Sequence, residues 1–175
     1  MPRAKTWFAA VPSGNAAALL RGQADFVTQF MGRLFDDLDA HQLGGATSLH
    51  FHRLRDEVRF RVIGPVGAIP PLEADINQRL RAAQTTGLVL SYRSEPEGNW
   101  ETPDPTYGTD VAGVAPAFTQ FMETVSRATI AFLKAGGTAV PDQVLWNWLH
   151  LLHNPMTGIE RHIVEVAPGS AVYRL

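Results

Sequence analysis

The chain has 175 residues, about the length of one globular domain, and an ordinary composition with 45% hydrophobic and 18% charged residues. Its formal net charge of -2 argues against a dedicated nucleic-acid-binding protein, because such proteins carry a basic excess. No apolar run is long enough to span a membrane, and no signal peptide is expected. The absence of cysteine excludes disulfides and thiolate chemistry, and it is compatible with a cytoplasmic location.

The hydrophobic pattern of the first half predicts an α+β domain with ferredoxin-like order. A short strand over 7–11 precedes a long amphipathic helix, capped by Asn15 or Ser13 and ended by Gly44-Gly45. Alternating strands over 48–54 and 58–64 form a tight hairpin, a second helix runs over 72–80, and a strand covers 88–92. The order β-α-β-β-α-β predicts an antiparallel sheet with two helices on one face. The other face is expected to be solvated, covered by later segments, or used in a homodimer.

We expect a single domain over 1–175, in which a core over 1–93 is followed by a polar loop over 94–114 and by helices and a tail over 115–175. One helix is predicted over 116–133, with Phe118, Phe121, Val125 and Phe132 on one side. Another begins near Pro141 and ends before Pro155. The last residues form either a hairpin around Pro168-Gly169 or a loosely ordered tail.

The predicted hairpin carries four arginines, Arg53, Arg55, Arg59 and Arg61. Arg59 and Arg61 alternate with apolar residues and therefore share the polar face of their strand. Guanidinium groups bind carboxylate or phosphate with two parallel hydrogen bonds, so the cluster could hold an anionic group. The alternative is a solvated outer face that discourages edge pairing.

Histidines form the second group of candidates. His50 and His52 share a strand face beside the arginines, and this crowding by positive charge makes a metal site there unattractive, so no metal is expected. His150 lies near the end of a predicted helix, where the helix dipole favours its charged form, and it could act as a general acid or base. The alternative for His150 is a hydrogen-bonded, partly buried structural histidine.

The polar loop is acidic and aromatic, with Glu101 and Tyr107 among its residues. Its carboxylates, if they face the arginines, could orient a peptide or act as bases. The alternative is that the loop is merely solvated.

Several of these segments together resemble the C-terminal domain of lantibiotic dehydratases and its free-standing thiopeptide-biosynthesis relatives. The stretch SLHFHRLRDEVRFRV over 48–62 is similar to the family's R-Y-x-D and L-R-L-R strands, and SRATIAFL over 126–133 is similar to its D-S-x-x-x-L helix. Tyr92 and Tyr107-Gly108 stand in the order of its next block. The family's closing H-x-x-x-N-R-L-x-G-I pattern is matched at His150, Asn154 and Gly158-Ile159. Thr106 and Pro155 stand where relatives have arginines, and the stretch between Leu133 and Val144 is shorter than theirs.

The resemblance implies a tailoring enzyme for a ribosomally made, post-translationally modified peptide. Relatives either join two dehydroalanines in a formal [4+2] cyclisation to a pyridine with loss of the leader peptide, or eliminate glutamate from glutamylated Ser/Thr. The missing arginines favour the cyclisation, with elimination and a non-catalytic precursor-binding role as alternatives. The resemblance assigns acid/base work to His150, assisted by Glu101 or Tyr107, and substrate binding to the hairpin arginines and Asn154, with no cofactor. Its expected partners are the modified precursor peptide and other biosynthetic enzymes.

Overall fold

The computed structural model describes residues 2–54, 56–99 and 115–137. The chain divides into two compact units, Met1–Gly136 and Gly137–Leu175. The helix predicted from Pro141 and the predicted terminal hairpin therefore lie outside the described residues.

The sheet confirms the predicted α+β fold. Its strands are β1 (Pro2–Ala10), β2 (Ser48–Leu54), β3 (Glu57–Pro65) and β4 (Ser91–Ser94), in the order β2-β3-β1-β4, and each pairs antiparallel with its neighbour. β1 and β3 form the centre through a register that runs from Pro2↔Pro65 to Ala10↔Glu57. This is the strand order of a ferredoxin-like fold, in which each helical connection crosses over one intervening strand.

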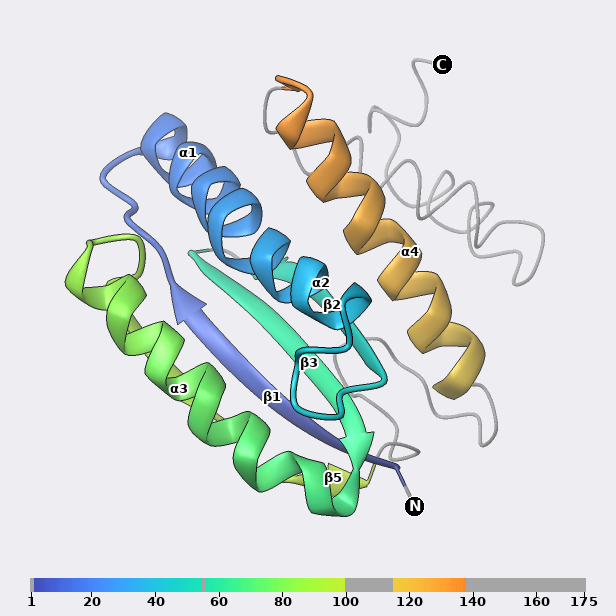
Figure 1. Cartoon of the computed structure of the whole chain (residues 1–175). Coiled ribbons are helices and arrows are strands. Elements are labelled where there is room, and N and C mark those ends of the chain that lie inside the picture. The colour runs from blue at the N-terminus through green and yellow to red at the C-terminus, as the bar shows by residue number, and fades with distance from the viewer. Residues whose placement is uncertain (1, 55, 100–114, 138–175) are drawn as a thin grey trace, which may run out of the picture. The chain divides into compact units, whose positions relative to one another are not determined.

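Two helical segments cover one face of this sheet (Figure 1). The first comprises α1 (Ala16–Phe26), a π-helical turn η1 (Val27–Met31) and α2 (Gly32–Asp39), and the Asn15 side chain caps its start by accepting a hydrogen bond from the Ala18 N–H at 2.9 Å. The second comprises a 3-10 turn η2 (Val66–Ala68) and α3 (Ile69–Thr85), whose first turn contains Pro70 and Pro71, positions where the missing N–H costs no helical bond.

An aromatic stack forms the centre of the core between sheet and helices. The rings of Trp7 and Phe60 are stacked with centroids 5.3 Å apart, and Phe30 meets Phe60 at 5.8 Å. Trp7 is fully buried, and its indole N–H donates to Asn77 Oδ1 of α3 at 3.0 Å. The ring therefore contributes its large apolar area without leaving a buried donor unpaired.

The fourth strand differs from its predicted position. Leu88 and Val89, predicted as its beginning, instead complete the end of α3: Gly87 has a φ of 75°, and the N–H groups of Leu88 and Val89 both donate to the Ala83 carbonyl. The Leu90 N–H then donates to the Ala10 carbonyl of β1. Leu88 and Val89 cover the end of the helix, and a helix end has no hydrophobic periodicity that would distinguish it from the start of a strand. β4 begins only at Ser91.

The start of the predicted polar loop continues the sheet. A two-residue strand β5 (Gly98–Asn99) pairs with Arg3 and Ala4 of β1, beyond the part of β1 that pairs with β4. Between the pairs Ser94↔Trp7 and Gly98↔Ala4, the stretch 94–98 advances by one residue more than the stretch of β1 beside it. This extra residue is a bulge that separates β4 from β5. Pro96, which cannot donate to a ladder, lies in this bulge.

Helix α4 (Ala115–Lys134) confirms the helix predicted over 116–133 and runs along the free edge of β2 (Figure 1). Its buried residues are Thr119, Met122, Ser126 and Ile130, a stripe different from the apolar side noted in the sequence. The Phe51 N–H of β2 donates to Ser126 Oγ at 3.0 Å, and Ser126 Oγ lies 3.3 Å from the Phe51 carbonyl oxygen. Ser126 Oγ donates to the Met122 carbonyl of its own helix at 2.7 Å, so it accepts from the Phe51 N–H and pairs one backbone donor at the edge of β2.

Candidate functional site

The sheet face turned away from α1–α2 and α3, which we call the distal face, gathers the hairpin's histidines and two of its arginines. Side chains alternate along a strand, so the residues that share this face are fixed by the register. His50 lies directly opposite Arg61, and His52 lies opposite Arg59. Directly opposed residues have Cβ atoms about 4.5–5.5 Å apart. The register therefore places two guanidinium-bearing and two imidazole-bearing residues in adjacent rows.

This cluster is not a solvated outer face. The exposed fractions of His50 and Arg59 are 3% and 6%, and His52 and Arg61 are partly buried. The alternative interpretation of the hairpin arginines as a solvated outer face is therefore wrong for Arg59. Buried cations lose hydration and need polar or negatively charged groups around them, which makes this part of the face chemically distinctive.

The row of Arg59 continues across the whole sheet through Phe8 of β1 to Arg93 of β4. The Arg93 guanidinium carbon lies 3.6 Å from the centre of the Phe8 ring, and that of Arg59 lies 5.4 Å from it. Both distances are within the range of a cation–π interaction. Phe8 thus holds two guanidinium groups at one end of the distal face.

Two glutamates accompany these arginines. Arg93 Nη2 lies 2.9 Å from Glu57 Oε2, a hydrogen-bonded ion pair. Arg59 Nη2 lies 4.0 Å from Glu95 Oε2, which is longer than a hydrogen bond. The carboxylates of Glu57 and Glu95 indicate the kind of anionic group that this cluster accommodates.

The structure does not bring Arg53 into this group. Arg53 pairs with Val58 in the sheet register and lies on the opposite, helix-facing side, where its Nη1 donates to Gln23 Oε1 of α1 at 3.1 Å. Arg55, Glu101, Tyr107, His150 and Asn154 lie outside the described residues. Of the residues predicted for the site, the structure therefore brings together only Arg59 and Arg61.

Sequence reasoning missed Phe8 and Arg93 as members of the site. Both lie on strands far from the hairpin in sequence, and only the pairing of β1 with β3 and β4 places them in the row of Arg59. Phe8 resembles any core residue in a short apolar strand. Without the strand register, the sequence therefore does not indicate that its side chain lies on the distal face.

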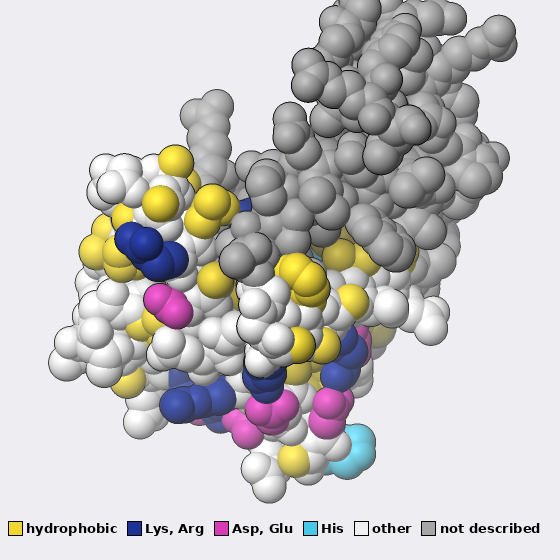
Figure 2. Space-filling view, turned by 90° about the horizontal axis from the view of Figure 1, so that it is seen from above, with side chains coloured by type: hydrophobic (Ala, Val, Ile, Leu, Met, Phe, Trp, Pro, Cys, Tyr) yellow, Lys and Arg dark blue, Asp and Glu magenta, His cyan; other side chains and the backbone are white. Residues whose placement is uncertain are grey.

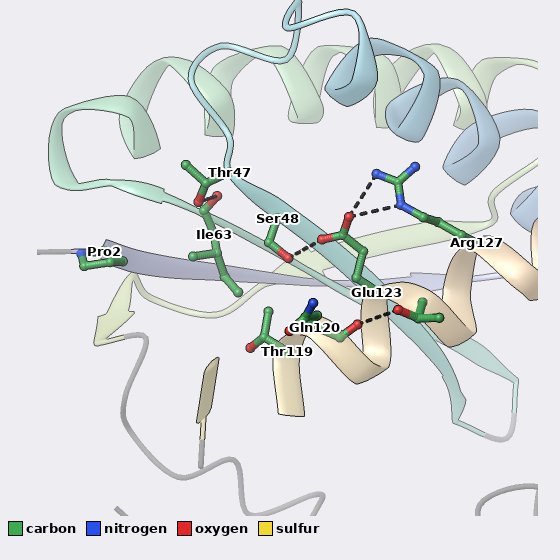
Figure 3. Close-up of a pocket in the computed structure, with 9 residues that line it drawn as sticks. Pro2, Thr47, Ser48, Ile63, Thr119, Gln120, Glu123 and Arg127 are labelled. Carbon is green, nitrogen blue, oxygen red and sulfur yellow. Dashed lines mark hydrogen bonds and ion pairs between the residues drawn. The ribbon is translucent and has the colours of Figure 1, made fainter. Parts of the chain in front are cut away.

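A second, separate feature is a pocket of about 450 Å³ between the first half of α4 and the start of β2. Figure 3 shows the side chains of Ser48, Glu123 and Arg127 converging beside it, and Ser48 Oγ donates to Glu123 Oε2 at 2.6 Å. Arg127 Nε donates to Glu123 Oε1 at 3.0 Å, and its two terminal nitrogens each lie 2.8 Å from an oxygen of Asp39. The charged groups of the pocket are thus engaged with one another.

This network fastens α4 to α2 and β2. Hydrogen bonding from Arg127 lowers the pKa of Asp39 below its usual value, and the bond to Asp39 raises the pKa of Arg127. Both charges are favoured in the folded protein. On the face that Figure 2 shows, basic and acidic side chains lie beside one another and form no patch of one sign among the coloured residues. The charged groups that line the pocket therefore have a structural role, which is to hold α4 against α2 and β2.

Within residues 2–54, 56–99 and 115–137, no group of three His, Cys, Asp or Glu side chains is arranged to hold a metal ion. No helix in the same ranges has both the length and the apolar character needed to cross a bilayer.

The chain matches no protein-family model, no curated protein and no solved structure.

Proposed function

We propose that the chain is a tailoring enzyme for a ribosomally made peptide, acting in the cytoplasm, and that it holds its substrate against the distal face. The observation that carries the proposal is the pairing of His50 with Arg61 and of His52 with Arg59 on one sheet face. Arginine binds carboxylate or carbonyl oxygens, and imidazole exchanges protons near neutral pH. Peptide modification by elimination or ring closure requires both functions in one place.

The reaction proposed first is the formal [4+2] cyclisation of two dehydroalanines, as in the family that the sequence resembles. The amide that precedes one dehydroalanine tautomerises to its imidic acid, which gives a C=N–C=C unit, and the two ends of this unit form C–C bonds with the alkene of the second dehydroalanine. Loss of the imidic acid hydroxyl as water and of the leader peptide as its amide then gives the pyridine. The main contribution of the protein is to hold the two alkenes in bonding geometry. Arg59 and Arg61 bind amide carbonyls, and His50 and His52 beside them exchange protons. The family resemblance adds His150 as acid or base, with help from Glu101 or Tyr107.

Glutamate elimination is the second candidate, and the distal face provides a specific reason for it. Arg59 lies among carboxylates of its own chain, at 4.0 Å from Glu95, and a glutamyl group presents the same carboxylate. In this reaction a base removes the α-proton of the glutamylated residue, the Cβ–O bond breaks, and glutamate leaves with its carboxylate. The product is a dehydroamino acid.

Mass spectrometry of two precursors distinguishes these proposals. A precursor that contains dehydroalanines releases its leader peptide if the chain is a cyclase, and a glutamylated precursor loses glutamate if it is an eliminase. An Arg61→Gln variant should lower either activity at least tenfold, because it removes one guanidinium from the pair. If neither precursor changes mass but both bind, the chain is the non-catalytic binding partner, and both enzymatic proposals are wrong.

A further inference from the structure

Helix α4 is attached to the described fold by few buried apolar side chains. Ile130 belongs to the apolar core and Leu133 packs against that core, whereas Met122 is buried outside it. Helix α3, by contrast, places a continuous apolar stripe in the core, which comprises Ile69, Leu72, Ile76, Leu80 and Ala83. An element with few buried apolar contacts opens at a lower free-energy cost than the core does.

Charged groups provide much of the remaining attachment, through α2. The terminal nitrogens of Arg127 lie 2.8 Å from the two oxygens of Asp39, and its guanidinium carbon lies 4.7 Å from the centre of the Phe35 ring. Lys134 Nζ lies 3.7 Å from Asp36 Oδ2. The side chains of Asp39 and Asp36 are 59% and 69% exposed, so salt can screen both ion pairs. We therefore expect the attachment of α4 to weaken as ionic strength rises.

The part of the fold that α4 covers is the outer edge of β2. The Phe51 N–H points to this edge, where it donates to Ser126 Oγ at 3.0 Å. Hydrogen-bonding directions alternate along an antiparallel strand, so the backbone groups of Leu49 and Arg53 face the same edge. β2 has 7 residues, whereas β4 at the opposite edge has 4 and is followed by the bulge at Pro96. Helix α4 therefore covers the sheet edge that has the longer uninterrupted strand.

We propose that α4 is a strap, held to α2 by charge, that opens without global unfolding and uncovers the edge of β2. Three observations carry the proposal: the sparse apolar contacts of α4, its exposed ion pairs with α2, and the side-chain bond at Phe51. The inference is independent of the proposed function, because it concerns the edge of β2 and not the distal face. Its consequence for that function is that one side of the strand that carries His50 and His52 becomes accessible when α4 opens.

Amide hydrogen exchange of the full chain, followed by NMR, tests the proposal with two reporters. The Phe51 amide exchanges when α4 leaves the edge of β2, because its acceptor lies on α4. The Phe60 amide lies in β3, between β2 and β1, and reports global unfolding. Exchange at both amides is measured in the original chain and in two variants, at low and at high salt.

The two variants remove equivalent arginines from different helices. Arg127→Gln removes the ion pair between α4 and Asp39. Arg79→Gln is the matched control, because Arg79 of α3 pairs in the same way with Asp75 of its own helix and Asp37 of α2. The pairs of Arg79 stay intact when only α4 opens, so the control separates opening of α4 from global unfolding.

In the original chain, we expect the Phe51 amide to open at least about tenfold more often than the Phe60 amide and to depend little on low concentrations of urea, because opening of α4 exposes little surface. Arg127→Gln should speed exchange at both amides by about three- to tenfold, since its contacts are made only while α4 is docked. Arg79→Gln should speed exchange at Phe60 alone. A rise from about 0.05 M to about 1 M NaCl should speed exchange at Phe51 about two- to fivefold.

Two kinds of result would overturn the strap. If Phe51 and Phe60 open equally often, or if Arg79→Gln speeds exchange at Phe51 as much as Arg127→Gln does, α4 leaves the edge of β2 only when the whole fold unfolds. If Arg127→Gln or added salt leaves exchange at Phe51 unchanged, charge does not hold α4 in place.

Discussion

Replacing Ser126 with alanine removes the hydroxyl that joins α4 to the edge of β2. Ser126 is 1% exposed, so water does not replace the lost group easily. The Phe51 N–H loses its acceptor at 3.0 Å, and the Phe51 carbonyl loses its neighbour at 3.3 Å. A buried backbone group left without a partner costs about 1–3 kcal/mol. Since the hydroxyl hydrogen goes to the Met122 carbonyl at 2.7 Å, the Phe51 N–H is the backbone group that is left buried without a partner. We therefore expect Ser126→Ala to lower the free energy of unfolding by about 1–3 kcal/mol.

Urea unfolding followed by circular dichroism measures this change, and Thr124→Ala is the matched control. Thr124 lies on the same helix, and its hydroxyl donates only to the Gln120 carbonyl of its own helix at an exposed position. Its loss should change the unfolding free energy by less than about 0.5 kcal/mol. Amide hydrogen exchange adds a local test, since the Phe51 amide should exchange faster in Ser126→Ala alone. Equal destabilisation by the two variants would refute the assigned role of Ser126.

Three further predictions concern separate parts of the chain. Arg61→Gln should weaken peptide binding at least tenfold in a fluorescence titration, whereas Arg53→Gln, on the other sheet face, should leave it within about twofold; equal losses would contradict the distal site. Gly22→Ala should destabilise the fold in thermal melts, because the new Cβ would lie 2.7 Å from the Pro12 carbonyl oxygen. Gly32→Ala meets the flexible Lys134 side chain at 3.2 Å and Ile130 at an ordinary contact distance of 3.7 Å, and it should stabilise the fold by up to about 1 kcal/mol. The pKa of Asp39 is lowered in the folded protein, so its charge stabilises the fold at pH values above the unfolded pKa of 3.8, and this stabilisation is lost as pH falls through the folded pKa. The difference in unfolding free energy between the original chain and Asp39→Asn should therefore shrink below about pH 4. A difference that does not depend on pH would contradict the role assigned to Asp39.

The fold was predictable where periodicity was strong. The helix that follows Asn15 and the hairpin strands each carry a repeat that only one type of element satisfies. The position of β4 was not predictable in this way, because Leu88 and Val89 are apolar for a different reason: they cover the end of α3 after the left-handed turn at Gly87. A short apolar run after a helix serves either purpose, and tertiary contacts decide between them.

The site was predictable only in part, for a similar reason. Alternation along one strand placed Arg59 and Arg61 on the same face, since that inference needs no partner strand. The pairing of Arg59 with His52 and its continuation to Phe8 and Arg93 depend on how three strands align, and single-strand patterns contain no such information. The burial of Ser126 was likewise not apparent, because α4 packs by a stripe that contains polar residues whose hydrogen bonds reach the sheet edge.

The central claim is that the distal face of the sheet is the peptide-binding site, and amide chemical-shift mapping of the full chain tests it most directly. On titration with an extended decapeptide that contains one central glutamate, we expect the amide signals of Thr6, Arg59, Arg61 and Arg93 to shift, because these residues share that face by register. Shifts confined to the pocket beside Thr119 and Gln120, or to the helix-facing pair of Lys5 and Glu73, would contradict it.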